Sequence, residues 1–294
     1  MPAPAAWRTI SGIERAPQNG MRPRVRLQAQ RSALRAVLLA LVGLATGACG
    51  ASEGDTGPVA EKPSCIYGGQ ATEHLYHLSL AQREAIVNLD LTASSETGTF
   101  GASCSGVLVA PGWVLTAAHC AEDSGQIAAT VGFYGAASNV PDGCGADPAA
   151  LDRVPSRRVV RHATLDAMLV ELGEAPASAA PEPLPVASDD GLAVPREVEL
   201  AGYGWTDRDS PGELHFVAEP ISALSGTWIE VDGKGRSGAC TADSGGPLLA
   251  QDAAGKVFVA GVLSQGSSSC LGTDRYVRTS ALATFIADTT GSAH

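Results

Sequence analysis

Short apolar stretches, separated by polar and turn-forming residues, dominate the chain from Ile66 onward. One group ends near Leu172 and a second begins near Pro185. Strands of about 4–8 residues bounded by Gly, Pro, Asn or Asp show this pattern. The stretches read AIVNLDL, SGVLVA, GWVLTA, AATVGFYG, RRVVRH and AMLVEL, then REVELAGYGW, LHFVAEPI, GTWIEV, GPLLAQ, VFVAGVLS and RYVRT. The pattern predicts an all-β protein whose short strands form two barrels or sandwiches.

The last segment, SALATFIADTT, has a different period. It predicts a short helix with Ser280 as its N-cap and with Leu282, Phe285 and Ile286 on one face. Between the two groups of strands, the Pro- and Ala-rich run GEAPASAAPEPLP indicates a linker. The sequence contains no internal repeat.

The first 48 residues resemble a leader. From Met21 a basic run, MRPRVRLQAQRSALR, precedes the apolar run AVLLALVGLATGA, which is typical of a signal peptide. The apolar run is shorter than the ~20 residues that span a bilayer. Residues 1–20 do not belong to this pattern, so we expect translation to start at Met21. A buried helix is the alternative interpretation.

The leader ends in Gly-Ala-Cys, which resembles a bacterial lipobox, although Thr46 occupies the position where Leu is usual. The resemblance implies that Cys49 is acylated and holds the protein at a membrane. Residues 49–65 are small and polar and predict a flexible tether or propeptide. The expected location is therefore outside the cytoplasm, as a cell-envelope lipoprotein or a secreted protein.

The charge of the chain argues against polyanionic partners. Its net charge is −11, but residues 1–48 carry seven Arg and one Glu, so the remainder carries −17. Such a domain repels nucleic acids and anionic membrane surfaces.

Seven cysteines are present, and six of them remain when Cys49 is set aside. An even number in an exported protein predicts disulfides. No Cys-x-x-Cys pair occurs, which argues against zinc. We therefore expect no metal and no organic cofactor.

Three segments carry candidate chemistry: GWVLTAAHC ending in His119-Cys120, LDAMLVEL containing Asp166, and TADSGGPLL containing Ser244. A serine hydroxyl is a weak nucleophile unless a base takes its proton, and imidazole is suited to that task at neutral pH. The imidazole needs an acceptor on its other nitrogen, which Asp166 can supply. Asp152 is a rival for this role.

The TAAHC and DSGGP segments, in this order and spacing, resemble the trypsin/chymotrypsin family of serine proteases. The resemblance covers Ile66 to the C-terminus. It implies two antiparallel six-stranded β-barrels (about 66–175 and 185–294), an active site between them and a short C-terminal helix. It also implies a serine endopeptidase that forms an acyl-enzyme on Ser244.

The family's disulfide pattern implies how the cysteines pair. The bridges would be Cys104–Cys120 around the histidine segment and Cys240–Cys270 around the serine segment. Cys65 and Cys144 are the two cysteines left over, and we expect them to pair with each other.

The resemblance also implies substrate-binding positions. Ser264-Gln265-Gly266 resembles a segment that pairs with the substrate backbone, with Gln265 replacing an aromatic residue. Gly238 occupies the base of the S1 pocket, and Asp274 occupies a wall where Gly is usual. An acid there favours a basic P1 residue. Alternatively, Asp274 faces solvent or pairs with Arg275.

Two features depart from the family. Ala242 replaces a Gly whose N–H, with that of Ser244, forms the oxyanion hole. If the loop requires φ > 0, the added Cβ strains it and the peptide can flip. Ile66-Tyr67-Gly68-Gly69 resembles the activation site, where a freed Ile66 amine pairs with Asp243. Cys65 precedes Ile66, so a trypsin-like protease would not cut there. Either a protease of another specificity cuts before Ile66, or Asp243 has a different partner.

Two other functions remain as alternatives. A catalytically weak or inactive homologue would bind proteins through the same cleft, which Ala242 favours and the intact triad disfavours. An α/β-hydrolase esterase would need Gly-x-Ser-x-Gly, and Ala242 replaces its first Gly.

Overall fold

The computed structural model describes residues 68–95, 98–121, 126–134, 151–187, 190–206 and 213–292. The expected leader, the start at Met21, the tether, Cys49 and the Cys65–Cys144 pair lie outside these ranges, as does Ile66. None of the helices within these ranges is long and apolar enough to cross a membrane.

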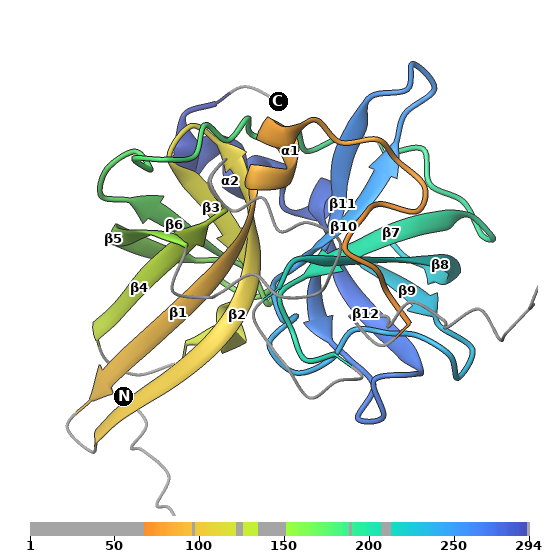
Figure 1. Ribbon diagram of the computed structural model, residues 1–294, viewed down its shortest axis with the longest axis horizontal. Helices are drawn as coiled ribbons and strands as arrows, with labels where there is room; N and C mark the ends of the chain where they lie inside the picture. The colour runs from red at the N-terminus through yellow and green to blue at the C-terminus, as the bar shows by residue number, and fades with distance from the viewer. Residues whose placement is uncertain are drawn as a thin grey trace, which may run out of the picture. The chain divides into compact units, whose positions relative to one another are not determined.

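Two closed barrels of six antiparallel strands make up the fold, which confirms the all-β prediction (Figure 1). The N-terminal barrel has the strand order β1-β2-β3-β6-β5-β4 and the C-terminal barrel β10-β11-β12-β9-β8-β7. The strands of the first are β1 (Ile86–Ser95), β2 (Gly98–Ala110), β3 (Trp113–Thr116), β4 (Gln126–Phe133), β5 (Asp152–Arg161) and β6 (Met168–Leu172). Those of the second are β7 (Glu197–Gly202), β8 (His215–Leu224), β9 (Trp228–Asp232), β10 (Pro247–Gln251), β11 (Val257–Gln265) and β12 (Thr273–Arg278).

Closure of each barrel explains the apolar pattern of the strands. Strand β9 alternates between buried and partly buried positions, as a strand with one face on a core does. Strand β11 is buried along nearly its whole length. Its Val259 and Val262 belong to the same hydrophobic cluster as Leu115 of β3, so this core is continuous between the two barrels. Burial on both faces produces the continuous apolar run VFVAGVLS.

The C-terminal helix α2 (Ala283–Thr290) begins later than predicted. The expected N-cap, Ser280, is wrong: it lies in the 3-10 turn η3 (Thr279–Ala281). Thr279 Oγ1 donates to the carbonyl of Val259 at 2.6 Å, and Leu282 N donates to Thr279 O at 2.9 Å. These bonds close a tight turn against β11, so the α-helix starts only after Leu282.

The short helix α1 (Leu80–Glu84) begins with a capping box between Ser79 and Gln82. The segment before it is fixed to the C-terminal barrel. Gln70 exchanges two backbone hydrogen bonds with Phe216 of β8 at 2.9 and 2.8 Å. The buried Glu199 carboxylate of β7 accepts the backbone N–H groups of residues 74–76. The chain is therefore held on the second barrel before it enters the first.

Candidate active site

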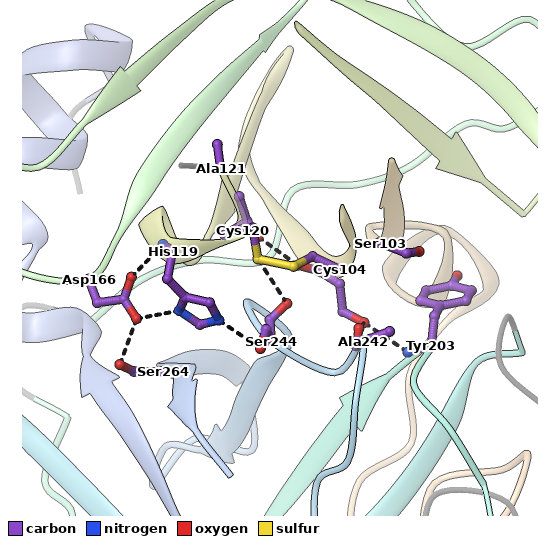
Figure 2. The surroundings of a disulfide bond; sticks show 12 residues. Ser103, Cys104, His119, Cys120, Ala121, Asp166, Tyr203, Ala242, Ser244 and Ser264 are labelled. Atoms are coloured by element: carbon purple, nitrogen blue, oxygen red, sulfur yellow. Dashed lines mark hydrogen bonds and ion pairs between the residues drawn. A yellow bond between two sulfur atoms is a disulfide. The ribbon is translucent and has the colours of Figure 1, made fainter. Parts of the chain in front are cut away.

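His119, Asp166 and Ser244 meet although they come from three separate loops (Figure 2). His119 lies in the 3-10 turn η1 (Ala118–Cys120) after β3, Asp166 lies between β5 and β6, and Ser244 lies just before β10. His119 Nε2 lies 2.8 Å from Ser244 Oγ, and its Nδ1 lies 2.7 Å from Asp166 Oδ2. The structure thus brings together all three residues predicted from the sequence. With neutral imidazole, Nδ1–H donates to Asp166 and Nε2 accepts from the serine hydroxyl.

Asp166 accepts two further hydrogen bonds. The backbone N–H of His119 donates to Oδ1 at 2.8 Å, and Ser264 Oγ donates to Oδ2 at 2.7 Å. Burial alone would raise the pKa of Asp166, but the hydrogen bonds from His119 and Ser264 outweigh it and hold that pKa below its usual range. Asp166 therefore stays charged beside the imidazole. The rival Asp152 lies at the start of β5 and accepts from Ser178 instead.

The side chain of Ser264 reaches Asp166 because of an irregularity in β11. The pairing of β11 with β12 shifts register between Leu263 and Gln265, and such bulges redirect a side chain beside active sites. From the sequence, Ser264 is predicted only to bind the substrate backbone, whereas in the structure it also donates to Asp166. Gln265 and Gly266, its neighbours in that segment, are exposed.

His162, which no sequence motif indicates, shapes the loop that carries Asp166. Its Nδ1 accepts the backbone N–H groups of Thr164 at 3.2 Å and Leu165 at 2.9 Å. Its ring packs edge-on against Phe285 of α2, with 5.1 Å between ring centroids. The C-terminal helix therefore supports the Asp166 loop through this imidazole.

The Ser244 loop is packed too closely for side chains at its glycines. Gly245 has φ +80, and a Cβ there would lie 2.0 Å from Thr116 Oγ1 and 2.5 Å from Ser105 O. Gly245 N donates to Leu263 O at 2.9 Å, and Gly246 N donates to Asp243 O at 2.8 Å. The two glycines after the serine thus let both barrels approach its backbone.

Ala242 adopts the left-handed conformation, with φ +73, in which its Cβ was expected to strain the loop. A non-glycine residue is strained there because its Cβ crowds the backbone. The preceding peptide is fixed, since Trp205 N donates to Thr241 O at 2.8 Å. In a trans peptide the N–H points opposite to the C=O, so this bond fixes the direction of the Ala242 N–H.

Asp243 is buried and turned toward the 202–204 segment. Its Oδ1 accepts from Gly204 N at 2.8 Å and its Oδ2 from Cys240 N at 2.9 Å. Burial raises its pKa to about 7; the two hydrogen bonds oppose that rise and Asp274 adds to it. Its expected partner, the Ile66 amine, lies outside the described residues.

Asp274, predicted on a wall of the S1 pocket, is buried and lies against Gly238, the residue predicted at the base of that pocket. Its Oδ2 accepts from Ala239 N at 2.6 Å, and its Oδ1 accepts from Ser267 N at 3.0 Å. A Cβ on Gly238 would lie 3.1 Å from Oδ2. Asp274 therefore does not face solvent, while Arg275 forms an ion pair with Glu230 at 3.3 Å. Burial raises the pKa of Asp274 to about 6, against the hydrogen bonds from its two backbone donors.

A second carboxyl, Glu219 of β8, lies near Asp274 and was missed from the sequence. Its side chain is fully buried, and Oε1 accepts from Ser237 Oγ at 2.8 Å. Burial raises its pKa to about 8; the Ser237 hydrogen bond opposes this, and the charges of Asp274 and Asp232 add to it. The folded protein therefore keeps this carboxyl protonated at neutral pH.

Replacing Glu219 by Gln is expected to stabilise the protein increasingly as the pH rises from about 4.5 to about 8, with the full effect above pH 8. The pKa rises from 4.5 to about 8 on folding, so the stabilising contribution of the proton is complete below pH 4.5 and is lost as the pH rises through 8. Each pKa unit corresponds to about 1.4 kcal/mol. Denaturant titrations should show Glu219→Gln close to the wild type at about pH 4 and more stable at about pH 9. Parallel pH profiles of the free energy of unfolding for the wild type and Glu219→Gln would contradict this prediction. The control is the exposed Glu197→Gln, whose profile should match that of the wild type.

Two of the three expected disulfides lie within the described residues. Cys104–Cys120 joins β2 to the His119 turn, with Cα atoms 6.3 Å apart. Cys240–Cys270 closes a loop of 30 residues around Ser244, with Cα atoms 4.8 Å apart. Among the described residues, no group of three or more His, Cys, Asp or Glu side chains could hold a metal ion.

Comparisons with known proteins agree with this geometry. The family model described as Trypsin matches residues 81–286. The chain is 29% identical over 233 residues to chymotrypsin-like elastase family member 3B of Macaca mulatta, covering 67% of this chain and 86% of that protein. A structure of GrC superposes with a TM-score of 0.56 and 22% identity, covering 76% of this chain and 99% of GrC. HL collagenase superposes with the same TM-score and 19% identity, covering 76% of this chain and 100% of HL collagenase.

Proposed function

Because this chain belongs to the trypsin family of serine proteases, we propose that it is an endopeptidase that forms an acyl-enzyme on Ser244. One observation carries the proposal: an unbroken line of hydrogen bonds runs from Ser264 through Asp166 and His119 to Ser244 Oγ. A module that only binds proteins does not require these hydrogen bonds, whereas a serine protease does. Family membership implies protein or peptide substrates.

The residues have distinct tasks in the proposed reaction. His119 Nε2 takes the hydroxyl proton as Ser244 Oγ attacks the scissile carbonyl, and Asp166 stabilises the imidazolium that results. The backbone N–H groups of Ala242 and Ser244 stabilise the oxyanion. His119 then donates its proton to the leaving amine, and water releases the acyl group by the reverse sequence of proton transfers.

Incubation of the protein with a mixture of unlabelled peptides, read by mass spectrometry, tests this proposal. New peptide termini should appear with the wild type and be absent with Ser244→Ala. A second candidate is an inactive homologue that binds peptides, which the strained φ of Ala242 favours. Peptide binding without cleavage, equal in wild type and Ser244→Ala, would support that candidate instead.

We propose a preference for basic P1 residues, held by Asp274. Its carboxylate lies against Gly238 and carries two backbone hydrogen bonds that orient it. The preference requires the charged carboxylate of Asp274, and the pKa of Asp274 is about 6. The ratio of kcat/KM for P1 Arg over P1 Ala should therefore rise between pH 5 and pH 8.

Asp274→Gly should lower kcat/KM for P1 Arg by about 30-fold or more, since loss of a desolvated charge pair costs about 2 kcal/mol or more. Activity toward P1 Ala should change little, and the pH dependence of the Arg/Ala ratio should disappear. Chromogenic peptides with P1 Arg, Phe and Ala measure these values. The exposed Asp288→Asn controls for a change in overall charge. A wild type that does not favour Arg would overturn the assignment.

We further propose that the chain is exported and activated by cleavage before Ile66. The leader predicts export, Cys49 predicts acylation, and the amine of Ile66 would be a partner for the buried Asp243. Mass spectrometry of the mature N-terminus distinguishes an acylated Cys49 from a free terminus at Ile66. A protein that keeps the basic leader would contradict export.

A further inference from the structure

Ser105, on β2, forms hydrogen bonds through its hydroxyl, its backbone N–H and its carbonyl to residues in and beside the Ser244 loop. It is completely buried. Its Oγ donates to Ala242 O at 3.0 Å and accepts from Tyr203 N at 2.9 Å. Its backbone N donates to Ser244 O at 2.8 Å, and its carbonyl accepts from Thr116 Oγ1 at 2.7 Å. A residue of the N-terminal barrel therefore holds the loop that the C-terminal barrel supplies.

The hydroxyl acts where the loop is strained. Ala242 has φ +73, which alanine disfavours because of its Cβ. The peptide before Ala242 is tied by Trp205 N to Thr241 O, and the peptide after it is tied by Ser105 Oγ to Ala242 O. Because hydrogen bonds hold the peptide groups on both sides of Ala242, its φ and ψ angles cannot change to a less strained conformation.

We infer that Ser105 is a positioning residue for the oxyanion-binding loop. It holds Ala242 in its left-handed conformation, so that the N–H groups of Ala242 and Ser244 keep their direction toward the reacting carbonyl. The inference rests on the proposed function of Ser244. Ser105 itself does not touch the substrate, because its hydroxyl is buried between Tyr203 and Ala242.

The packing around Ser105 determines which variants test this role. A Cβ on Gly202 would lie 3.2 Å from Ser105 Oγ, and one on Gly246 would lie 3.3 Å from Ser105 Cβ. A larger side chain at position 105 would thus meet these backbones. Ser105→Ala removes the hydroxyl without adding volume, and Ala242→Gly removes the strain that the hydroxyl counters, because glycine adopts positive φ readily.

The experiment is a double-mutant cycle of Ser105→Ala and Ala242→Gly, with kcat and KM measured for one peptide substrate. In the wild-type background, Ser105→Ala should lower kcat about 10-fold and leave KM within about twofold, as expected when transition-state stabilisation alone is lost. In the Ala242→Gly background, the same change should lower kcat by less than about threefold. The exposed Ser103→Ala, on the same strand, should leave both constants unchanged.

A purely structural role predicts other results. Loss of the acceptor for Tyr203 N lowers thermal stability equally in the wild-type and Ala242→Gly backgrounds, so melting temperatures report it separately. Equal losses of kcat in both backgrounds, or a change in KM alone, would overturn the inference while the wild-type activity upholds the proposed function. A folded wild type without turnover would overturn the proposed function, and the inference with it.

Discussion

Replacing Ser244 by Ala is expected to lower kcat for peptide hydrolysis by roughly 10⁶-fold, because nucleophile, base and orienting acid work as one unit. His119 Nε2 lies 2.8 Å from Ser244 Oγ, so the variant removes the atom that would form the acyl bond. A residual rate above that in water should remain from the oxyanion donors. Initial rates with a fluorogenic peptide measure the loss.

The control for this change is Ser222→Ala, an exposed serine on β8 whose hydroxyl donates to Glu230 O at 3.2 Å. Its kcat should stay within about twofold of the wild type. Melting temperatures of both variants should confirm that they fold. Loss of less than about 100-fold in a folded Ser244→Ala protein would mean that another residue is the nucleophile.

Replacing Asp166 by Asn should lower kcat by about 10⁴-fold. Asp166 accepts from His119 N, His119 Nδ1 and Ser264 Oγ. An asparagine whose oxygen keeps the bond from His119 N turns its NH₂ group toward Nδ1. The imidazole then becomes the tautomer with its proton on Nε2, which cannot accept the proton of Ser244.

The matched control for Asp166 is Asp152→Asn. Asp152 accepts a hydrogen bond from Ser178 N at 2.7 Å and forms none with His119 or Ser244. Its replacement should therefore change kcat by less than about twofold. Rates at saturating peptide, with Tm as the test of folding, compare the two variants. Equal losses in both would contradict the assignment of Asp166.

Local sequence was sufficient to predict the strands and the three side chains that meet at the candidate active site. The apolar runs match the barrel strands because one face of each strand packs on a core. His119 and Ser244 lie in distinctive segments, and Asp166 could be chosen over Asp152 by its position before AMLVEL. The buried Asp274 was also named in advance, but the sequence did not decide between solvent and a buried position.

The contacts that support these residues could not be predicted, because they depend on pairing between distant segments. Ser264 lies where the pairing of β11 with β12 shifts register, and it donates to Asp166 from that position. Ser105 and Ala242 are 137 residues apart in the chain and meet through barrel packing. Ser280 failed as an N-cap because Thr279 bonds to β11 and delays the helix. Each of these outcomes follows from tertiary contacts that override a local pattern.

We expect Ser244 to be an activated nucleophile, and its reaction with a fluorophosphonate probe measures this reactivity. The full-length protein, with Ser244→Ala and His119→Ala variants beside it, would be incubated with the probe, digested and mapped by mass spectrometry. We expect one adduct, on Ser244, that does not form in Ser244→Ala and forms much more slowly in His119→Ala. A folded wild type with an N-terminus at Ile66 that takes up no probe, or carries it on another residue, would contradict the claim.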